Sequence, residues 1–237
     1  MKEMNVKELE KKIGINFKDK GILITALTHS SFANQFKDIK YNERLEFLGD
    51  SVLQLTITEN LFNTYKNKSE GELTKIRALI VCENSLFEVA SKMQLGKIIR
   101  MSKGEELTGG RNRISIQADC LEAVIAAIYL DRGIEVAKEF ILTRFEEIIR
   151  KAINQEIILD FKTRLQEVLQ KNGEVNIAYE LIKYEGPPHR RIFFTQVRIN
   201  GEVMGCGEGY SKKEAEQNAA KEALGKVEKT KWQKDII

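Results

Sequence analysis

Through the first 153 residues, the spacing of hydrophobic positions predicts helices almost throughout. Apolar residues recur at intervals of three and four, which gives a helix one apolar face. The segments with this spacing are 6–12, 19–30, 42–65, 71–93, 116–130 and 133–153. Within one of them, residues 118–130 are apolar nearly all round. That pattern is typical of a helix in the middle of a bundle, and it predicts an all-α domain.

From about residue 175 the pattern changes to the alternation that is typical of β-strands. Three runs alternate and are rich in aromatic and β-branched residues: YELIKYE, RIFFTQVRIN and EVMGCGEGY. Asn200-Gly201 is a turn signal between the last two. The amphipathic segment FKTRLQEVLQKN precedes the strands and SKKEAEQNAAKEALGKV follows them. We therefore predict an all-α domain over 1–153, followed by a small α+β domain of order α-β-β-β-α over 158–228.

Charge and cysteine content narrow the class of protein. The net charge of +3 lies wholly in residues 161–237, which suggests that the second domain meets a polyanion. The three cysteines are odd in number and scattered, which argues against a disulfide framework or a zinc cluster and is typical of a reducing compartment. Neither a signal peptide nor a membrane span is predicted. We expect a cytoplasmic protein with no membrane partner.

Acidic residues inside an apolar segment are the first sign of chemistry. In NERLEFLGDSVL, Glu43, Glu46 and Asp50 follow one another at i, i+3 and i+7, so they share an arc of roughly 60° on a helix. A solvated acidic stripe is the ordinary interpretation of such spacing. The apolar neighbours and the lack of a basic residue four positions after Glu43 or Glu46 weaken that interpretation, since partly buried acids need protonation, a distant cation or a metal ion.

A second acidic pair lies in the most apolar segment. Asp119 and Glu122 stand at i and i+3, again on one helical face. If the two acidic helices pack together, four or five carboxylates meet in one cleft. Oxygen ligands alone select hard cations such as Mg²⁺ or Mn²⁺, which suit the hydrolysis of phosphodiesters. Cys120 is expected to be a buried thiol rather than a nucleophile, and His29 a structural residue rather than a general base.

The motifs of the whole chain resemble those of the ribonuclease III family. NERLEFLGDSVL looks like the family's signature segment. The flanking motifs fall in the family's order: ALTHSSFAN, EGELTKIRALIV, KGEELTGGRNRISIQAD and DCLEAVIAAIYLD. The second domain resembles a double-stranded-RNA-binding domain in KTRLQEVLQ, GPPHRRIFF and GEGYSKKEAEQNAAKEAL. Gln117 and Cys120 depart from the usual pattern, but neither replaces an acid.

The resemblance implies an endonuclease of double-stranded RNA that depends on Mg²⁺, with Mn²⁺ able to replace it. Glu46, Asp119 and Glu122 match the family's metal ligands, and Asp50 matches a further catalytic acid at or near the metal. Glu43 matches an outer acid of the cluster. Family members are homodimers that leave 5′-phosphate and 3′-hydroxyl ends with a short 3′ overhang, and processing of ribosomal and messenger RNA precursors is the implied role. Phe47 resembles the aromatic residue that packs into the partner, and Glu70 an acid that helps to place the RNA.

The second domain is expected to recognise the shape of A-form RNA, which has a wide minor groove lined by 2′-hydroxyls. Thr163, Gln166 and Glu167 lie on its first helix and match minor-groove contacts, as does His189 in the loop between the first two strands. Ser211 and Glu214 form a capping-box pattern at the start of its last helix. Two further residues, Lys212 and Lys213, then stand at a positive helix N-terminus that suits phosphate. Three glycines in GxGxG spacing are expected to pack tightly rather than to bind phosphate.

Two other hypotheses compete with the endonuclease. A non-catalytic RNA-binding or chaperone protein would use both domains for docking, but it gains nothing from Glu46, Asp50, Asp119 and Glu122 facing phosphate. A helical metal-binding scaffold leaves the second domain unexplained. The sequence therefore favours an endonuclease.

Overall fold

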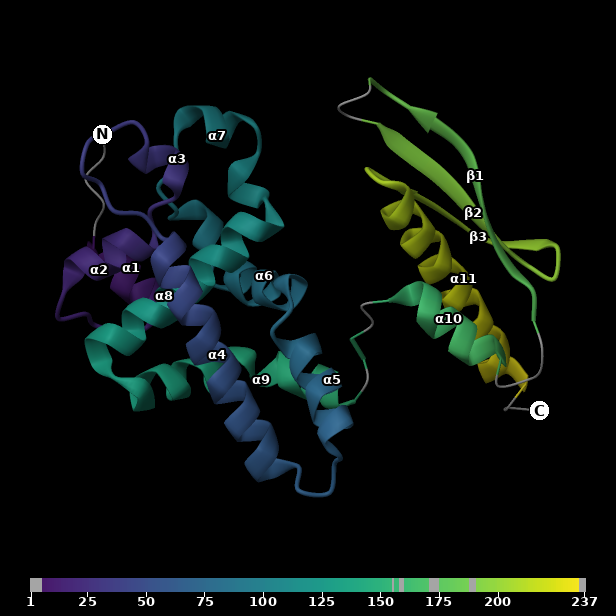
Figure 1. The fold of residues 1–237 in the computed structure, drawn as a ribbon, viewed down its shortest axis with the longest axis horizontal. Coiled ribbons are helices and arrows are strands. Elements are labelled where there is room, and N and C mark those ends of the chain that lie inside the picture. The colour runs from purple at the N-terminus through teal and green to yellow at the C-terminus, as the bar shows by residue number, and fades with distance from the viewer. Residues whose placement is uncertain (1–5, 155, 158–159, 171–174, 188–190, 235–237) are drawn as a thin grey trace. The chain divides into compact units, whose positions relative to one another are not determined.

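The structure, a computed structural model, describes residues 6–154, 156–157, 160–170, 175–187 and 191–234. The chain divides into two compact units, Met1–Ile157 and Ile158–Ile237 (Figure 1). The first unit is helical, and the second combines helices with a three-stranded sheet. This confirms the predicted fold class.

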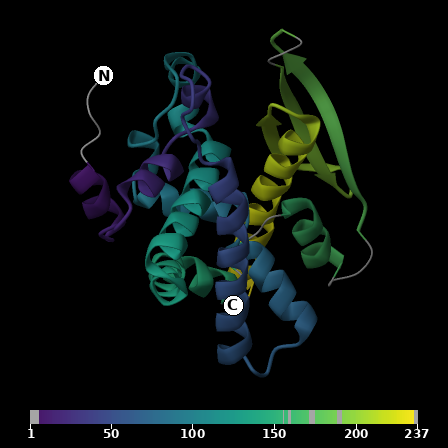
Figure 2. The same ribbon diagram turned by 60° about the vertical axis from the view of Figure 1, so that its left-hand side comes forward.

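Two long helices form the centre of the first unit. Here α4 (Glu43–Thr64) packs against α8 (Ile114–Arg132), and Figures 1 and 2 show the two side by side. Most of α8 is buried, including Leu121, Val124 and Ile125, which are fully inaccessible to solvent. This confirms that the helix that is apolar nearly all round lies in the middle of the bundle, because a helix with neighbours on every side needs no polar face.

Other helices surround this pair. The contacts of α8 include α2 (Lys20–Ala26), α6 (Glu83–Lys92) and α9 (Ile134–Ile153). In addition, α5 (Glu70–Ile80) contacts α4 and α9, and α1 spans Val6–Ile13. Short helices complete the unit: α3 (Ser30–Ala33), α7 (Lys103–Leu107), η1 (Leu95–Lys97) and η2 (Gly110–Asn112).

Two predicted helices are each divided in the structure. The segment 19–30 breaks after α2, where Leu27 and Thr28 bond to Arg100 in another part of the chain and His29 caps α3. The segment 71–93 breaks at Cys82, whose backbone is extended. Ser85 there donates its hydroxyl hydrogen to the Leu79 carbonyl at 2.6 Å, so a side chain satisfies a carbonyl at the end of α5.

The second unit is an antiparallel sheet with helices on it. Its strands are β1 (Ile177–Glu185), β2 (Ile192–Ile199) and β3 (Glu202–Gly209), in the spatial order β1-β2-β3. Helix α11 (Lys212–Lys234) packs on β3 and β2, and α10 (Phe161–Gln170) packs on α11. A small core holds them together: Leu165, Val168, Val197, Ala219, Ala220, Ala223 and Leu224.

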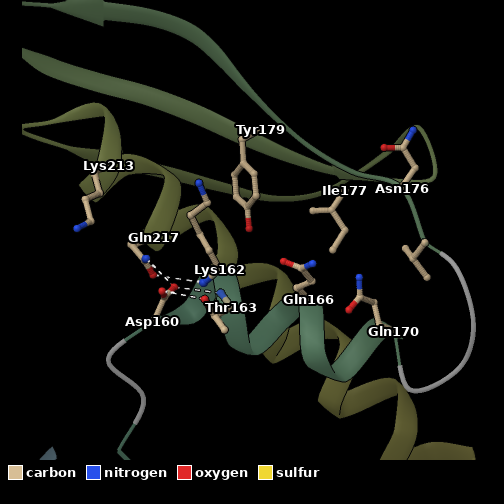
Figure 3. Close-up of a pocket in the computed structure, with 11 residues that line it drawn as sticks. Asp160, Lys162, Thr163, Gln166, Gln170, Asn176, Ile177, Tyr179, Lys213 and Gln217 are labelled. Atoms are coloured by element: carbon tan, nitrogen blue, oxygen red, sulfur yellow. Dashed lines mark hydrogen bonds between the residues drawn. The ribbon is translucent and has the colours of Figure 1, made fainter. Parts of the chain in front are cut away.

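Three glycines of β3 let α11 approach the sheet closely. A Cβ at Gly205 or Gly207 would overlap the backbone of Ala219, and a Cβ at Gly209 would lie 2.7 Å from the side chain of Glu214. The glycine spacing is thus explained by strand-helix packing, as predicted, and needs no phosphate ligand. In this unit, α10, the start of β1 and the start of α11 border a cavity (Figure 3).

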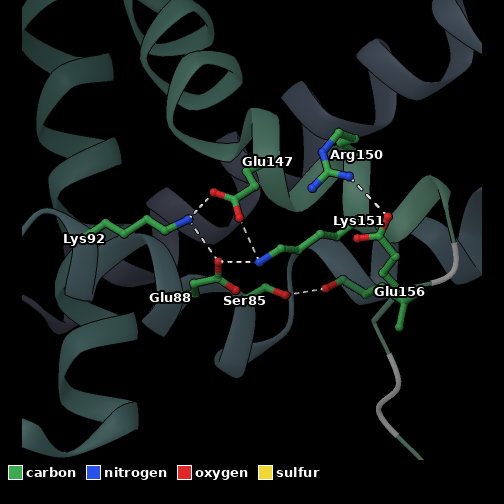
Figure 4. Close-up of polar contacts among 8 residues, drawn as sticks. Ser85, Glu88, Lys92, Glu147, Arg150, Lys151 and Glu156 are labelled. Atoms are coloured by element: carbon green, nitrogen blue, oxygen red, sulfur yellow. Dashed lines mark hydrogen bonds and ion pairs between the residues drawn. The ribbon is translucent and has the colours of Figure 1, made fainter.

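An ion-pair network fastens α6 to α9 in the first unit (Figure 4). Lys92 bonds to Glu88 and Glu147 at 3.0 and 2.6 Å, and Lys151 bonds to the same two acids at 2.8 and 3.0 Å. The hydrogen bonds from Lys92 and Lys151 lower the pKa of Glu147 to about 2. Each lysine therefore pairs with one acid of its own helix and one acid of the other helix. In this way the network links α6 and α9, which are distant in the sequence.

Candidate active site and RNA interface

The crossing of α4 and α8 is close because α4 has a glycine at the contact. Gly49 is buried, and a Cβ on it would overlap the backbone carbonyl of Glu122. Any other residue would push the two helices apart. The glycine therefore fixes how near the acids of α4 lie to those of α8.

Three carboxylates meet at this crossing. Glu46, Asp119 and Glu122 each place one carboxylate oxygen within 4.8 Å of the other two. All three side chains are half-buried. None of them forms an ion pair with any residue that the structure describes. The predicted convergence of the two acidic helices is thus observed for these three residues.

Burial and mutual repulsion make the three acids hard to ionise without a countercharge. Burial, followed by the nearby charges of Asp50, Glu46 and Asp119, raises the pKa of Glu122 to about 8. Burial and neighbouring acids also raise the pKa values of Glu46 and Asp119. A cluster of carboxylate oxygens with no ion-pair partner among the described residues fits a hard divalent ion.

The remaining predicted acids lie outside this group of three. The carboxylate of Asp50 is half-buried and accepts hydrogen bonds from Gln54 at 2.9 Å, and its charge still raises the pKa of Glu122. Glu43 is exposed in the first turn of α4 and raises the pKa values of Glu46 and Asp119. These two acids therefore border the cluster.

Glu70 is not brought to the cluster within one chain. It begins α5, after the C-terminal end of α4, and its carboxylate accepts a hydrogen bond from Thr74 at 2.9 Å. Along α4 alone, Glu46 and Thr64 are 18 positions apart, a distance of about 27 Å. A direct role beside the three acids would have to come from a second copy of the chain.

His29 and Cys120 both have structural roles. His29 caps α3, where its Nδ1 accepts the backbone N–H of Ser31 at 3.3 Å. Cys120 is fully buried, and burial raises the pKa of its thiol to about 12. The thiol therefore stays protonated and is no nucleophile. The predicted preference for structural roles at both positions agrees with this geometry.

Two residues of the site were missed by the sequence analysis. Gly49 carried a signal, because a glycine inside an apolar helical pattern costs stability unless a close approach requires it. Glu83, the first residue of α6, is exposed and raises the pKa of Asp119. It carried no signal, since its proximity to Asp119 depends on the break between α5 and α6.

In metal-free protein, the free energy of unfolding should fall as the pH rises from about 4.5 to about 8. The carboxyl of Glu122 titrates near its ordinary value of 4.5 when unfolded and at about 8 when folded. Between these values the folded state binds more protons than the unfolded state, so raising the pH opposes folding. Calorimetry in chelator across this range should show a shallower decline for Glu122→Gln than for the parent. An equally steep decline in both would contradict the assignment.

The predicted minor-groove residues of the second unit differ in their surroundings. The hydroxyl of Thr163 already donates a hydrogen bond to Asp160, the residue before α10, at 2.9 Å. Gln166 lines the cavity between α10 and β1 (Figure 3). Glu167 is exposed and pairs with Arg164 at 3.6 Å. His189 lies outside the residues that the structure describes.

The two lysines at the start of α11 are exposed, and neither forms an ion pair within the described part of the chain. Ser211 accepts the backbone N–H of Glu214 at 3.1 Å, whereas Glu214 accepts the N–H of Tyr210 rather than that of Ser211. The predicted cap is therefore present, but the reciprocal bond reaches one residue further back. Lys212 and Lys213 follow the cap directly, and Lys213 also lines the cavity beside α10.

Comparisons with known proteins match both units. Residues 19–149 match the family described as Ribonuclease-III-like, and residues 161–227 match the double-stranded RNA binding motif. Ribonuclease 3 of Clostridium perfringens is 73% identical over 237 residues, which is 100% of both chains. Ribonuclease 3 of Clostridium botulinum (strain Eklund 17B) is 70% identical over 229 residues, or 97% of this chain and 99% of that relative.

A solved structure agrees with these matches. The nuclease domain of ribonuclease III from Campylobacter jejuni has 46% identity and a TM-score of 0.56, and the match covers 60% of this chain and 97% of that one. Among the described residues, no helix is long and apolar enough to cross a membrane. The chain therefore belongs to the ribonuclease III family, as its motifs predicted, and it is an endoribonuclease of double-stranded RNA.

Proposed function

We propose that the three acids at the crossing of α4 and α8 hold the divalent cation with which this enzyme hydrolyses phosphodiester bonds. The observation that carries the proposal is that carboxylate oxygens of Glu46, Asp119 and Glu122 lie within 4.8 Å of one another, while none of the three acids forms an ion pair with a described residue. Mg²⁺ is the cation proposed, and Mn²⁺, with similar ligand preferences, should replace it. When bound, such an ion neutralises charge on the phosphate and makes water a better nucleophile.

The chain's own residues prepare the site for this ion. Gly49 keeps α4 and α8 close enough for one ion to contact acids of both helices. Glu122 is protonated near neutral pH when the cation is absent, so cation binding should release its proton. Asp50 and Glu43 border the cluster, and we assign to them the role of further acids that orient water and the ion. Products should carry 5′-phosphate and 3′-hydroxyl ends with a short 3′ overhang.

A cleavage assay tests this function. Purified protein should cut a long, perfect RNA duplex in Mg²⁺ and leave it intact in chelator. A duplex that stays intact in Mg²⁺ would favour the alternative of a non-catalytic RNA-binding protein. Cutting that continues in chelator would show that hydrolysis does not need a cation held by the acids. Precursors of ribosomal and messenger RNA are the proposed natural substrates, and the scattered free cysteines favour the cytoplasm.

The second unit is proposed to bind double-stranded RNA by recognising the shape of the A-form helix. Lys212 and Lys213 meet phosphates, and Thr163, Gln166 and Glu167 meet the minor groove, with His189 in the next minor groove. Glu70 helps to place the RNA.

Replacing Lys212 and Lys213 together by alanine should weaken duplex binding equally for unrelated sequences, because phosphates carry no sequence information. The slope of log affinity against log salt should shrink by about one to two. Lys226→Ala is the control, because Lys226 pairs with Glu222 and lies about 21 Å further along α11. Binding of two duplexes at several salt concentrations measures this, and an unchanged slope in the double variant would contradict it.

The enzyme is proposed to act as a homodimer through its first unit. The structure of the Campylobacter jejuni relative describes a region involved in dimer formation of its nuclease domain. In this chain, α4 exposes Phe47, Leu55 and Phe62 by 79%, 59% and 70%. These positions fall within about 80° on the helix, so they form one apolar stripe that a second copy would cover.

Phe47→Ala should weaken the dimer by about tenfold or more, because a buried aromatic anchor at an interface contributes about 2 kcal/mol or more. Phe36→Ala is the control, since Phe36 is 44% exposed but lies outside α4. Sedimentation over a range of concentrations gives both dimerisation constants. Equal constants for Phe47→Ala and the parent would exclude Phe47 from the interface.

A further inference from the structure

The second unit contains a polar cavity that the proposed duplex contacts only border. It has a volume of about 760 Å³, within the range of ~300–1,000 Å³ that is usual for small-molecule sites. Figure 3 shows α10 on one side and the start of β1 on the other. Lys213 and Thr163, which are assigned above to duplex binding, line it together with Tyr179 of β1 and Asn176, which directly precedes β1. The cavity therefore adjoins the surface that is proposed to meet RNA.

A buried hydroxyl in this cavity has no partner. The hydroxyl of Tyr179 points from β1 toward α10 (Figure 3), and it forms no hydrogen bond with any residue that the structure describes. A buried polar group without a partner is costly and calls for a ligand or water. Burial raises the pKa of Tyr179 to about 12, so the hydroxyl is neutral and can both donate and accept. Lys162 covers the ring, with its Nζ 4.4 Å from the ring centroid, so stacking on that face is blocked.

Amide side chains extend this polar wall. Gln166, Gln170 and Asn176 line the cavity, and their side chains form no hydrogen bond within the described ranges. Gln217 differs, because it accepts the N–H of Phe161 and donates to Asp160. The open amides and the phenol offer both donors and acceptors, while the cation of Lys213 lies at one end (Figure 3). A ligand with a heterocyclic edge and a phosphate complements this set.

We propose that the cavity holds one unpaired nucleotide of the RNA substrate, with its base edge at Tyr179, Gln170 and Asn176 and its phosphate toward Lys213. A paired base cannot enter, because its edge is occupied and leaving the stack costs free energy, whereas a bulged base is already free. This inference rests on the proposed duplex-binding role of the second unit. It adds that duplexes interrupted by an extrahelical nucleotide are bound more tightly than perfect ones.

Two duplexes of the same length test this, one perfect and one with a single bulged nucleotide, each titrated with the full chain. The parent should bind the bulged duplex about tenfold more tightly, the effect of one or two net hydrogen bonds. Tyr179→Phe should remove that preference and keep the affinity for the perfect duplex within about twofold. The matched control is Tyr184→Phe, an exposed tyrosine on the same strand that should keep the preference.

The outcomes separate this inference from the proposed function. Equal affinity of the parent for both duplexes, or a preference that survives in Tyr179→Phe, would overturn the nucleotide site while leaving duplex binding intact. Loss of binding to the perfect duplex by the parent would instead overturn the proposed function. Tyr179→Phe should keep or raise the melting temperature, because it removes a buried hydroxyl that has no partner to lose. If that variant fails to fold, Asn176→Ala, which changes an exposed side chain, must remove the preference, and its failure to do so overturns the site.

Discussion

Replacing Glu122 by glutamine should slow the cutting of duplex RNA by more than about a hundredfold and leave RNA binding nearly unchanged. The substitution keeps the size of the side chain and removes one of three charges that face the proposed cation. Groups that only support a metal ligand already cost about 10–100-fold when they are changed, so losing a ligand should cost more. Single-turnover cleavage and filter binding measure the two effects separately.

The matched control is Glu146→Gln. Glu146 is exposed on α9, away from the α4–α8 crossing, and forms no ion pair among the described residues. The Glu146→Gln variant should cut RNA at the parental rate. That result would show that the loss of cutting in Glu122→Gln does not follow from the change in net charge. Parental cutting by Glu122→Gln at low Mg²⁺ would refute the metal assignment.

Gly49→Ala should lower the free energy of unfolding by about 1–3 kcal/mol, although alanine is the better helix former. The added Cβ would overlap the carbonyl of Glu122, which is backbone and cannot rotate away. Cutting should also fall by about a hundredfold, because a shift of about 1 Å between catalytic groups has an effect of that size. Urea unfolding and single-turnover cleavage check the two parts.

Gly71→Ala provides the comparison. Gly71 lies in α5 with nothing within 4 Å of an added Cβ, so alanine there should stabilise the helix by up to about 1 kcal/mol. If Gly49→Ala were as stable and active as Gly71→Ala, the close crossing of α4 and α8 would not be what sets the acid cluster.

The sequence predicted the meeting of the acidic helices α4 and α8 better than it predicted where the other helices end. The acids of α4 and α8 repeat at helical spacing within apolar segments, and a periodic pattern of that kind survives in the fold because burial enforces it. In the structure Glu46 joins Asp119 and Glu122, whereas Asp50 accepts hydrogen bonds from Gln54. Periodicity alone does not show which acid of α4 joins the group.

The breaks between helices were the least predictable part of the fold. Nothing near Cys82 resembles a breaker, because the break depends on the hydroxyl of Ser85 and on helices packed around it. The break after α2 depends on Arg100, some 70 residues away in the chain. Such long-range contacts are invisible to a local pattern, whereas the Asn200-Gly201 turn is local and was predicted.

Glu46, Asp119 and Glu122 are proposed to bind one divalent cation together. Crystals of the parent and of Glu122→Gln, soaked in Mn²⁺ and measured at the manganese absorption edge, test it directly. An anomalous peak among the three carboxylates in the parent, lost or strongly reduced in Glu122→Gln, is the predicted result. A peak elsewhere in the parent, or one that persists undiminished in the variant, would contradict it.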